Sequence, residues 1–242
     1  MLEQVKIEDI LFIDIETVPE VADINQLDET VQELWEEKKG KHRTEEETIN
    51  EFYFHNAGIF AEFGKIICIS VGKISQTGMF QGFSVQSFYG DDEIKLLTDF
   101  SSFLKNELQK NRNINLCGHN IREFDVPYIC RRLLINNLKL PMYFESLQAK
   151  KPWEAGLLDS MDFWKFGDYK NYISLKLLAH CLGVPSPKDD ISGKDVGKVY
   201  WKEQNLHRIK TYCQKDVLTV AQIVLKLKGL SLISESNFKI IA

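Results

Sequence analysis

The 242-residue chain lacks the features that would direct it to a membrane, to secretion or to the coating of nucleic acid. No apolar run approaches the length of a membrane-spanning helix. The first residues, MLEQVKIEDILF, are acidic and lack the basic-then-apolar pattern of a signal peptide. A net charge of −5 argues against a protein that coats nucleic acid non-specifically through a basic surface. We therefore expect a protein with no membrane contact.

Cysteine is scarce and shows no metal or disulfide spacing. The chain has five cysteines and no CxxC pair: Cys68, Cys117, Cys130, Cys181 and Cys213. An odd, dispersed set predicts reduced thiols and a cytoplasmic location. Cys68, Cys117 and Cys181 stand in apolar segments, so we expect them in the core.

The chain also lacks internal repeats and low-complexity linkers, and 44% of its residues are hydrophobic. This composition predicts one domain over residues 1–242. Apolar residues at helical spacing amid many charges predict a helical insertion at about residues 20–62, with a break near Gly40.

The order of predicted elements indicates the fold class. Three strand-like runs come first: LFIDI, GKIICISVGKI and FSVQSFYG, with Gly78 and Gly82 expected in the connection between the last two. A helix after Asp91 and Asp92, the strand INLCGHN, a helix from Asp125, LLDSMDFWKF as a short strand and exit loop, a helix after Ser174 and a long last helix follow. This order predicts an α/β fold, a mixed sheet with three antiparallel strands first and helices at its sides.

Asp14 and Glu16 are the first candidates for chemistry. They stand two residues apart in the predicted strand, so their carboxylates point to the same face. Neighbouring carboxylates repel each other, and a hard divalent cation relieves that repulsion. Two interpretations stay open here: solvated acids at the end of a strand, or metal ligands.

Two further acids occupy suggestive positions. Asp125 follows a predicted strand and starts a predicted helix, where it is either a helix N-cap or a functional acid. Asp216 lies four residues after Tyr212 on the last helix, so the two side chains share a face. The apolar stripe of that helix starts directly after Asp216, which places this acid at the border between core and cleft. Four acids from three separate segments suit a site for two divalent cations about 4 Å apart.

Three motifs carry a family resemblance: DIET at residues 14–17, Asn120 with Phe124 and Asp125, and Tyr212 with Asp216. In this order, they resemble the three exonuclease motifs of the tyrosine branch of the DEDD superfamily. The chain is most similar to the proofreading exonuclease domain of family B DNA polymerases, and in particular to its stand-alone predicted bacterial relatives. The similarity extends from about Val5 to Leu227 and implies a ribonuclease H-like fold.

The resemblance implies a role for each acid. Asp14 would contact both of two Mg²⁺ or Mn²⁺ ions, and Glu16 would hold the ion that carries the attacking water. Asp125 would serve the second ion, mainly through water, and Asp216 would complete the first site. Tyr212 would orient the nucleophile.

The resemblance also implies substrate contacts. Asn120 and Phe124 would hold the terminal nucleotides, and the backbone near Thr17 would approach the terminal sugar. Thr211 stands where the histidine branch has its base, which agrees with the tyrosine assignment. The 20–62 insertion is longer than the core of the family requires, and two roles stay open for it: covering the cleft or binding a partner. A polymerase or a repair protein is a candidate partner in trans.

Three functions follow as hypotheses. The first is a metal-dependent 3'–5' exonuclease that acts on single-stranded DNA ends and releases nucleoside 5'-monophosphates. The second is a 3'–5' exoribonuclease, because the sequence does not reveal tolerance of a 2'-hydroxyl. The third, from another class, is a catalytically silent nucleic-acid-binding module.

Other residues keep two interpretations each. His119 is expected to be a hydrogen-bonded structural histidine rather than a substrate contact. Lysines in the predicted loop over residues 186–198 either contact phosphates or are solvated: Lys188, Lys194 and Lys198. A run of aromatic residues either stacks on bases or forms a core cluster: Phe163, Trp164, Phe166, Tyr169 and Tyr172.

Overall fold

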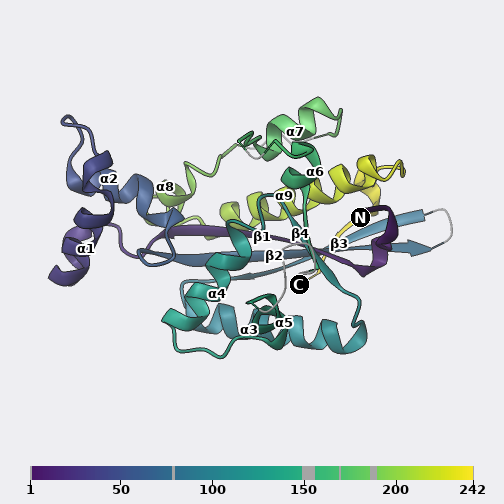
Figure 1. Cartoon of the computed structure of the whole chain (residues 1–242), viewed down its shortest axis with the longest axis horizontal. Coiled ribbons are helices and arrows are strands. Elements are labelled where there is room, and N and C mark those ends of the chain that lie inside the picture. Colours follow the sequence, from purple (N-terminus) through teal and green to yellow (C-terminus); the bar gives the residue numbers. More distant parts are fainter. Residues whose placement is uncertain (1, 78–79, 149–155, 169, 186–189, 242) are drawn as a thin grey trace.

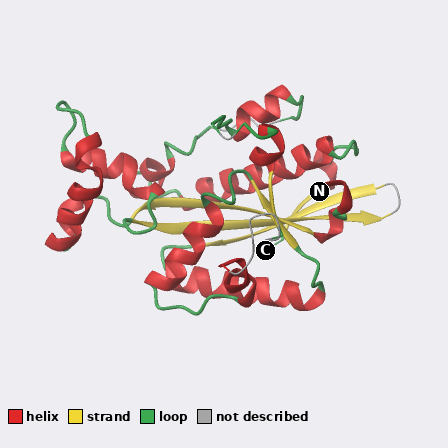
Figure 2. Ribbon diagram, in the orientation of Figure 1, coloured by secondary structure: helices red, strands yellow, loops and turns green. Residues whose placement is uncertain are grey.

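The chain folds into a six-stranded sheet with helices on both faces (Figures 1 and 2). The computed structural model describes residues 1–242 except for residues 1, 78–79, 149–155, 169, 186–189 and 242. The strands are β1 (Ile10–Pro19), β2 (Gly64–Thr77), β3 (Phe80–Tyr89), β4 (Asn115–Gly118), β5 (Leu157–Asp159) and β6 (Phe238–Ile240). They lie in the order β5-β4-β1-β2-β3-β6.

The sheet is mixed. β1 pairs antiparallel with β2, and β2 pairs antiparallel with β3. β4 runs parallel to β1, β5 runs parallel to β4, and β6 runs parallel to β3. The predicted α/β class, with three antiparallel strands first, is confirmed.

Helices cover both faces of the sheet (Figure 1). The helices are α1 (Glu29–Lys39), α2 (Ile49–Asn56), α3 (Glu93–Lys110), α4 (Asp125–Ile135), α5 (Met142–Gln148), α6 (Ser160–Lys165), α7 (Leu175–Cys181), α8 (Val196–Trp201) and α9 (Leu206–Leu227). α3, α4 and α5 lie below the sheet in the view, and α9 lies above it with α6 and α7 beyond. Within the described parts of the chain, none of the helices combines the length and apolar character that crossing a bilayer requires.

Alternation along β1 supplies a core on each side of the sheet. Leu11 and Ile13 pack with residues of α3 and α4, whereas Phe12 packs with Val217 of α9. α9 approaches β2 so closely that a Cβ on Gly72 would lie 2.8 Å from a methyl group of Val217. This close approach holds α9 against the strands next to β1.

The helix starts follow the sequence signals. Asp92 accepts a hydrogen bond from the amide of Lys95 at the start of α3, and Ser174 caps α7 in the same manner. Pro127 lies in the first turn of α4, where its missing amide hydrogen costs nothing. Gly183 follows α7 with a φ of +63°, the left-handed conformation in which glycine stops a helix.

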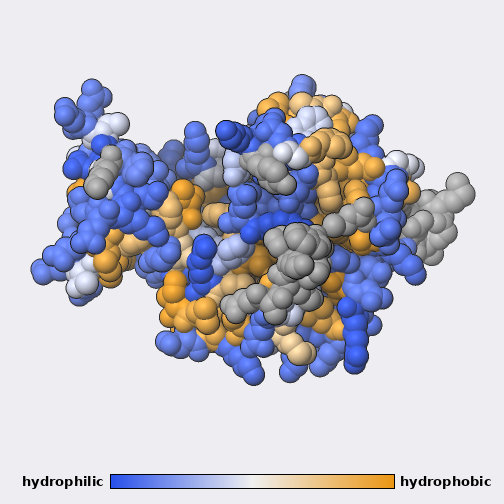
Figure 3. Space-filling view, viewed as in Figure 1, coloured by the Kyte–Doolittle hydropathy of each residue, from blue (hydrophilic) through white to orange (hydrophobic). Residues whose placement is uncertain are grey.

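The segment over residues 20–62 forms a lobe of its own at one end of the molecule (Figure 1). Its two helices, α1 and α2, enclose Trp35, which is fully buried among other aromatic rings. The rings of Phe52, Tyr53 and Phe63 have centroids 5.7, 5.4 and 5.2 Å from that of Trp35. Figure 3 shows that the outer surface of this lobe is mainly hydrophilic. The expected helices of this segment are therefore present, and its status as an insertion stays a prediction.

Several local expectations were wrong. Gly82 lies within β3 rather than in a turn, and Gly78 lies outside the described residues. The segment after β5 is helix α6 rather than an exit loop, because Asp159 caps it. Helix α8 starts at Val196, so the polar loop ends earlier than expected. Cys181 is exposed, whereas Cys68 and Cys117 are buried as expected.

Candidate active site

β1 carries the first two acids of the candidate site. Asp14 and Glu16 lie on the face that α9 covers, because they alternate in step with Phe12 of the α9 core. Glu16 is only 7% exposed, and Asp14 is half-buried. The pairing of β1 with β2 shifts register between Glu16 and Thr17. Such a bulge bends the strand and re-aims the side chains beside it.

Asp125 reaches β1 from the start of α4. β4 pairs with β1 only from Ile10 to Phe12, so the edge of β1 beyond this pairing is left free. The Oδ1 atom of Asp125 accepts a hydrogen bond from the amide of Ile15, at 3.1 Å, between the two acids of β1. The alternative of a helix N-cap is wrong, because Phe124 is the N-cap residue and makes no side-chain cap bond.

α9 brings Asp216 and Tyr212 to the same place. A hydrogen bond links the two side chains, as their spacing of four residues predicts. Cys213, between them in sequence, donates from its Sγ atom to the backbone carbonyl of Asp14 at 3.4 Å. α9 is thus fixed directly over the acids of β1.

Burial and mutual repulsion dominate the electrostatics. Burial, and next the charges of Asp216 and Asp125, hold the pKa of Asp14 well above its usual range. Burial and the charge of Asp14 do the same to the pKa of Glu16. Burial raises the pKa of Asp125 to about 7, although its hydrogen bonds lower it. Burial and the nearby carboxylates also raise the pKa of Tyr212, so its phenol stays protonated at neutral pH.

The donor set fits divalent cations. The Oδ2 atom of Asp14 is buried and has no hydrogen-bond partner within the described residues. Such an orphaned oxygen is costly unless a cation or water satisfies it. Ligand atoms of Asp14, Glu16 and Cys213 all lie within 4.8 Å of one another. Asp125 and Asp216 are outside that tight group, but their charges act on Asp14 directly.

The candidate substrate residues lie around these acids. Asn120 adopts a left-handed φ of +62° in the turn between β4 and α4. Phe124 is half-buried, and its ring centroid lies 5.4 Å from that of Tyr128. The Tyr128 hydroxyl contacts Thr17, so α4 and the end of β1 are joined. All eight residues predicted from the motifs thus belong to β1, the start of α4 with the turn before it, or α9.

Asp159 is a further residue of the site that the sequence reasoning missed. It is 2% exposed, and its Oδ1 atom accepts from the amides of Asn120 at 2.9 Å and Met161 at 3.0 Å. Its Oδ2 atom accepts from the amide of Arg122 at 3.2 Å. Asp159 therefore shapes the turn that carries Asn120. The available signal was an acid that ends the apolar run LLD directly before a helix.

His119 is the structural histidine that was expected. One ring nitrogen contacts the Ser160 hydroxyl at 2.9 Å, and the other contacts the Ile173 carbonyl at 2.8 Å. Burial lowers the pKa of His119. Its ring therefore ties the turn after β4 to α6 and to the segment before α7.

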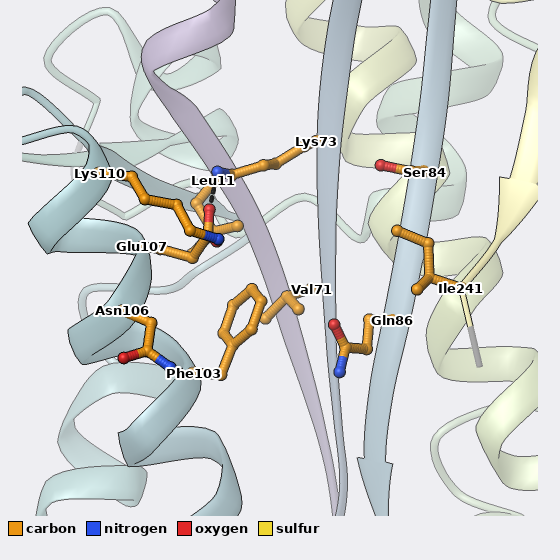
Figure 4. A pocket seen from close by; sticks show the side chains of 10 residues that line it. All are labelled: Leu11, Val71, Lys73, Ser84, Gln86, Phe103, Asn106, Glu107, Lys110 and Ile241. Carbon is orange, nitrogen blue, oxygen red and sulfur yellow. Dashed lines mark hydrogen bonds and ion pairs between the residues drawn. The ribbon is translucent and has the colours of Figure 1, made fainter.

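Two pockets differ in their relation to these acids. A pocket of about 360 Å³ opens beside the catalytic candidate Tyr212 and is otherwise lined by Asp190, Asn205, His207, Arg208, Thr211 and Lys215. Another, of about 310 Å³, lies on the opposite face of the sheet, where Lys73 and Lys110 both contact Glu107 (Figure 4). Leu11 lines this second pocket and points away from Asp14, so it is separate from the acids.

The structure describes two of the three lysines of the predicted loop. Lys194 is exposed, and Lys198 lies 3.7 Å from Glu203 in an exposed ion pair. Lys188 lies outside the described residues. Neither described lysine shows a contact with the candidate site, so their role in phosphate binding stays a prediction.

Comparison with known proteins identifies the family. The sequence model of predicted 3'–5' exonucleases related to the exonuclease domain of PolB matches residues 59–235, more than half of the chain. The chain belongs to this family. The resemblance inferred from the motifs is confirmed, and so is the ribonuclease H-like fold. A search of the curated proteins found no match.

The matched range of this exonuclease family contains Asn120, Phe124, Asp125, Tyr212 and Asp216. It begins after β1, so Asp14, Glu16 and Thr17 lie outside it. Two contacts join β1 to the matched range: the hydrogen bond from the Ile15 amide to Asp125 and the contact of Cys213 with the Asp14 carbonyl.

Proposed function

We propose that the chain is a metal-dependent 3'–5' exonuclease that hydrolyses phosphodiester bonds at the 3' end of single-stranded DNA. The observation that carries this proposal is the convergence of Asp14, Glu16, Asp125 and Asp216, with a buried Asp14 oxygen that has no hydrogen-bond partner among the described residues. Membership in a family of predicted 3'–5' exonucleases supports it. Nucleoside 5'-monophosphates are the proposed products.

Asp14, Glu16 and Asp216 would hold one Mg²⁺ or Mn²⁺ ion, and Asp14 with Asp125 would hold a second. Two such ions supply charge stabilisation for the attacking and leaving oxygens, and lower the pKa of a bound water. They also offset the repulsion that now raises the pKa values of these acids.

Tyr212 is proposed to orient the attacking water. Its hydroxyl is hydrogen-bonded to Asp216 and remains protonated, so it can donate to or accept from a neighbouring oxygen. Asn120 and Phe124 would hold the last nucleotides, because the turn that carries them precedes Asp125 directly. The backbone at Thr17 would face the terminal sugar.

The test follows loss of a 3' label from a single-stranded oligonucleotide with Mg²⁺ or Mn²⁺ and with EDTA. We expect stepwise shortening of a 5'-labelled strand from its 3' end, release of mononucleotides and no reaction in EDTA. Asp14→Asn should lower kcat by about 1,000-fold because it removes a cation ligand. Tyr212→Phe should lower it by about 100-fold.

Glu45→Gln is the matched control, because Glu45 is an exposed acid in the insertion. It should leave the rate unchanged. Matched RNA strands decide between the DNA and RNA alternatives through the ratio of kcat/KM. Full activity of Asp14→Asn, or tight oligonucleotide binding without turnover in any cation, would contradict the proposal and favour a silent binding module.

A further inference from the structure

Two aromatic rings are exposed to solvent in the segment between α6 and α7. Phe166 is 92% exposed and Tyr172 is 61% exposed. The other described members of this aromatic run are not: Phe163 packs on the α9 core, and Trp164 packs near Met161. The run therefore divides into core residues and surface residues. Single exposed apolar residues are common in proteins, so exposure alone assigns no role.

Phe166 is held in an unfavourable backbone conformation. It ends α6 with φ and ψ of 44° and 35°, the left-handed region that bulky residues avoid. Glycine is the usual residue at such a helix end, and Gly167 follows directly with a φ of +92°. A large ring therefore stands in water at a position where glycine would be less strained. With 92% of its surface exposed, Phe166 gains little packing from the described residues to offset that strain.

Tyr172 is fixed in place. Its hydroxyl donates to the Oε2 atom of Glu123 at 3.1 Å. The Nζ atom of Lys165 lies 4.4 Å from the centroid of its ring. Because Lys165 covers one side of the ring, the exposed area of Tyr172 belongs to the other side and the edge. The ring is thus a pre-oriented, open aromatic surface.

The segment with these two rings is joined to the turn of the candidate active site. Glu123, the partner of Tyr172, lies in the turn that runs from Asn120 to Phe124. The carbonyl of Ile173 contacts the ring of His119, at the start of the same turn. Both contacts hold Tyr172 next to the turn of the residues proposed to bind the terminal nucleotides. Phe166 directly follows Lys165, whose Nζ atom lies over the ring of Tyr172.

The charges near the rings are mixed. Lys170 and Lys176 are exposed, as are Glu123 and Asp168. Asp162 pairs with Arg122, at 3.2 Å. A surface with paired charges and two open rings favours stacking over purely ionic attraction as its mode of binding nucleic acid.

We propose that Phe166 and Tyr172 form a stacking platform for bases of a single-stranded substrate, upstream of the nucleotides at the cleavage site. This inference rests on the proposed exonuclease function and names the substrate class, an unpaired strand longer than the two or three terminal nucleotides. Aromatic rings stack on every base, so the platform is tolerant of sequence. Duplex ends, whose bases are already stacked, gain nothing from it.

The primary test measures the binding of 5'-fluorescein dT strands by anisotropy in EDTA, so that turnover plays no part. We expect Phe166→Ala/Tyr172→Ala to weaken binding of a strand of about 20 nucleotides by about 10-fold or more. A dT trinucleotide should bind the variant and the unchanged protein alike. Phe166→Tyr should retain binding, because it keeps a ring.

Met142→Ala is the matched control. Met142 is 82% exposed on α5, which lies on the other side of the sheet. It removes a similar exposed apolar side chain and should leave affinity unchanged. Phe166→Gly separates folding from binding, because it relieves the left-handed strain: its Tm should rise while its affinity for the long strand falls.

Binding of strands that each carry one abasic site, at successive positions from the 3' end, locates the bases that stack on the platform. In the unchanged protein, an abasic site at one or two positions upstream of the 3' end should weaken binding, and that penalty should vanish in the double variant. Coupling of this kind identifies stacking rather than charge. Absence of coupling at every position, or equal losses for long and short strands, would overturn the platform.

Measurements of nuclease activity distinguish failure of the stacking platform from failure of the proposed exonuclease function. In an active enzyme, the double variant should raise KM for long strands and leave kcat unchanged. Coupled stacking without any nuclease activity would refute the exonuclease and keep the platform. Nuclease activity without coupling would refute the platform alone.

Discussion

At the scale of single residues, the buried carboxylates of the candidate site repel one another. Asp125 is 3% exposed, and its carboxyl accepts hydrogen bonds from the amide of Ile15, at 3.1 Å, and from its own backbone amide. Its pKa of about 7 results mainly from burial, with contributions from Asp159 and Asp216. A cation-free protein therefore keeps this carboxyl protonated under mildly acidic conditions, which an exposed aspartate does not.

The raised pKa of Asp125 predicts how the free energy of unfolding depends on pH when divalent cations are absent. Below the ordinary pKa of 3.8, Asp125 is protonated in both folded and unfolded chains. Between that value and about 7, the unfolded chain releases the proton and the folded chain retains it, so stability falls as pH rises. Above about 7 the contribution is constant.

We therefore expect Tm in EDTA to fall as pH rises from about 4 to about 7, and to fall less in Asp125→Asn. Mn²⁺ should raise Tm of the unchanged protein at the higher pH more than that of the variant. Glu45→Gln should follow the unchanged protein in both experiments. Equal pH slopes for Asp125→Asn and the unchanged protein, measured by calorimetry, would show that Asp125 does not titrate as stated.

At the scale of elements, the turn between β4 and α4 depends on one buried side chain. Asp159, at the end of β5, accepts three backbone hydrogen bonds, two from this turn and one from the start of α6. Asn120 keeps its left-handed conformation within that set of contacts. The geometry of the turn that carries Asn120 is therefore set by a residue of a different strand.

Asp159→Asn should damage this turn, because an amide group presents a donor where the carboxylate accepts. We expect a loss of about 2 kcal/mol in the free energy of unfolding and about a 10-fold or larger fall in kcat/KM. Denaturant unfolding and steady-state kinetics measure the two effects. Asp92→Asn, at the exposed cap of α3, is the control and should lower stability slightly without a change in kcat/KM.

At the scale of the whole molecule, Arg132 connects the parts of the structure on the α3 side. Its guanidinium contacts Glu93 at the start of α3 through Nε at 2.9 Å, and Glu20 at the start of the insertion at 3.0 Å. It also donates to the carbonyl of Ala61 at 2.9 Å. Glu93 accepts from the amide of Ile66 in β2. One buried ion pair thus joins α3, α4, β2 and both ends of the lobe.

Arg132→Met should lower stability by about 3–5 kcal/mol, because it leaves Glu93 buried without its cation. We expect a fall in Tm of about 10 °C, with kcat unchanged at low temperature. The double variant Arg132→Met/Glu93→Gln should recover part of the loss, since Gln can still accept from Ile66. Arg131→Met, at the exposed neighbouring position, should have little effect. A larger loss in the double variant would contradict this account.

The sequence by itself determined the elements whose signals are local. The alternation of side chains along a strand placed Asp14 and Glu16 on one face of the sheet. The capping residues Asp92 and Ser174 marked the starts of α3 and α7. The spacing of four residues on a helix placed Tyr212 beside Asp216. The sequence did not reveal β6, whose pairing with β3 joins residues far apart in the chain. Nor did it reveal α6. The sequence signal for this short helix is weak, and its start depends on the buried N-cap residue Asp159.

Only the tertiary structure decided how the acids meet. The contact of Asp125 with Ile15 spans 110 residues, and that of Cys213 with Asp14 spans 199. Tertiary structure also separated exposed Phe166 and Tyr172 from buried neighbours of the same aromatic run. The physical reason is that side-chain burial and charge coupling depend on which distant segments pack together, whereas periodicity and capping are set within a few residues.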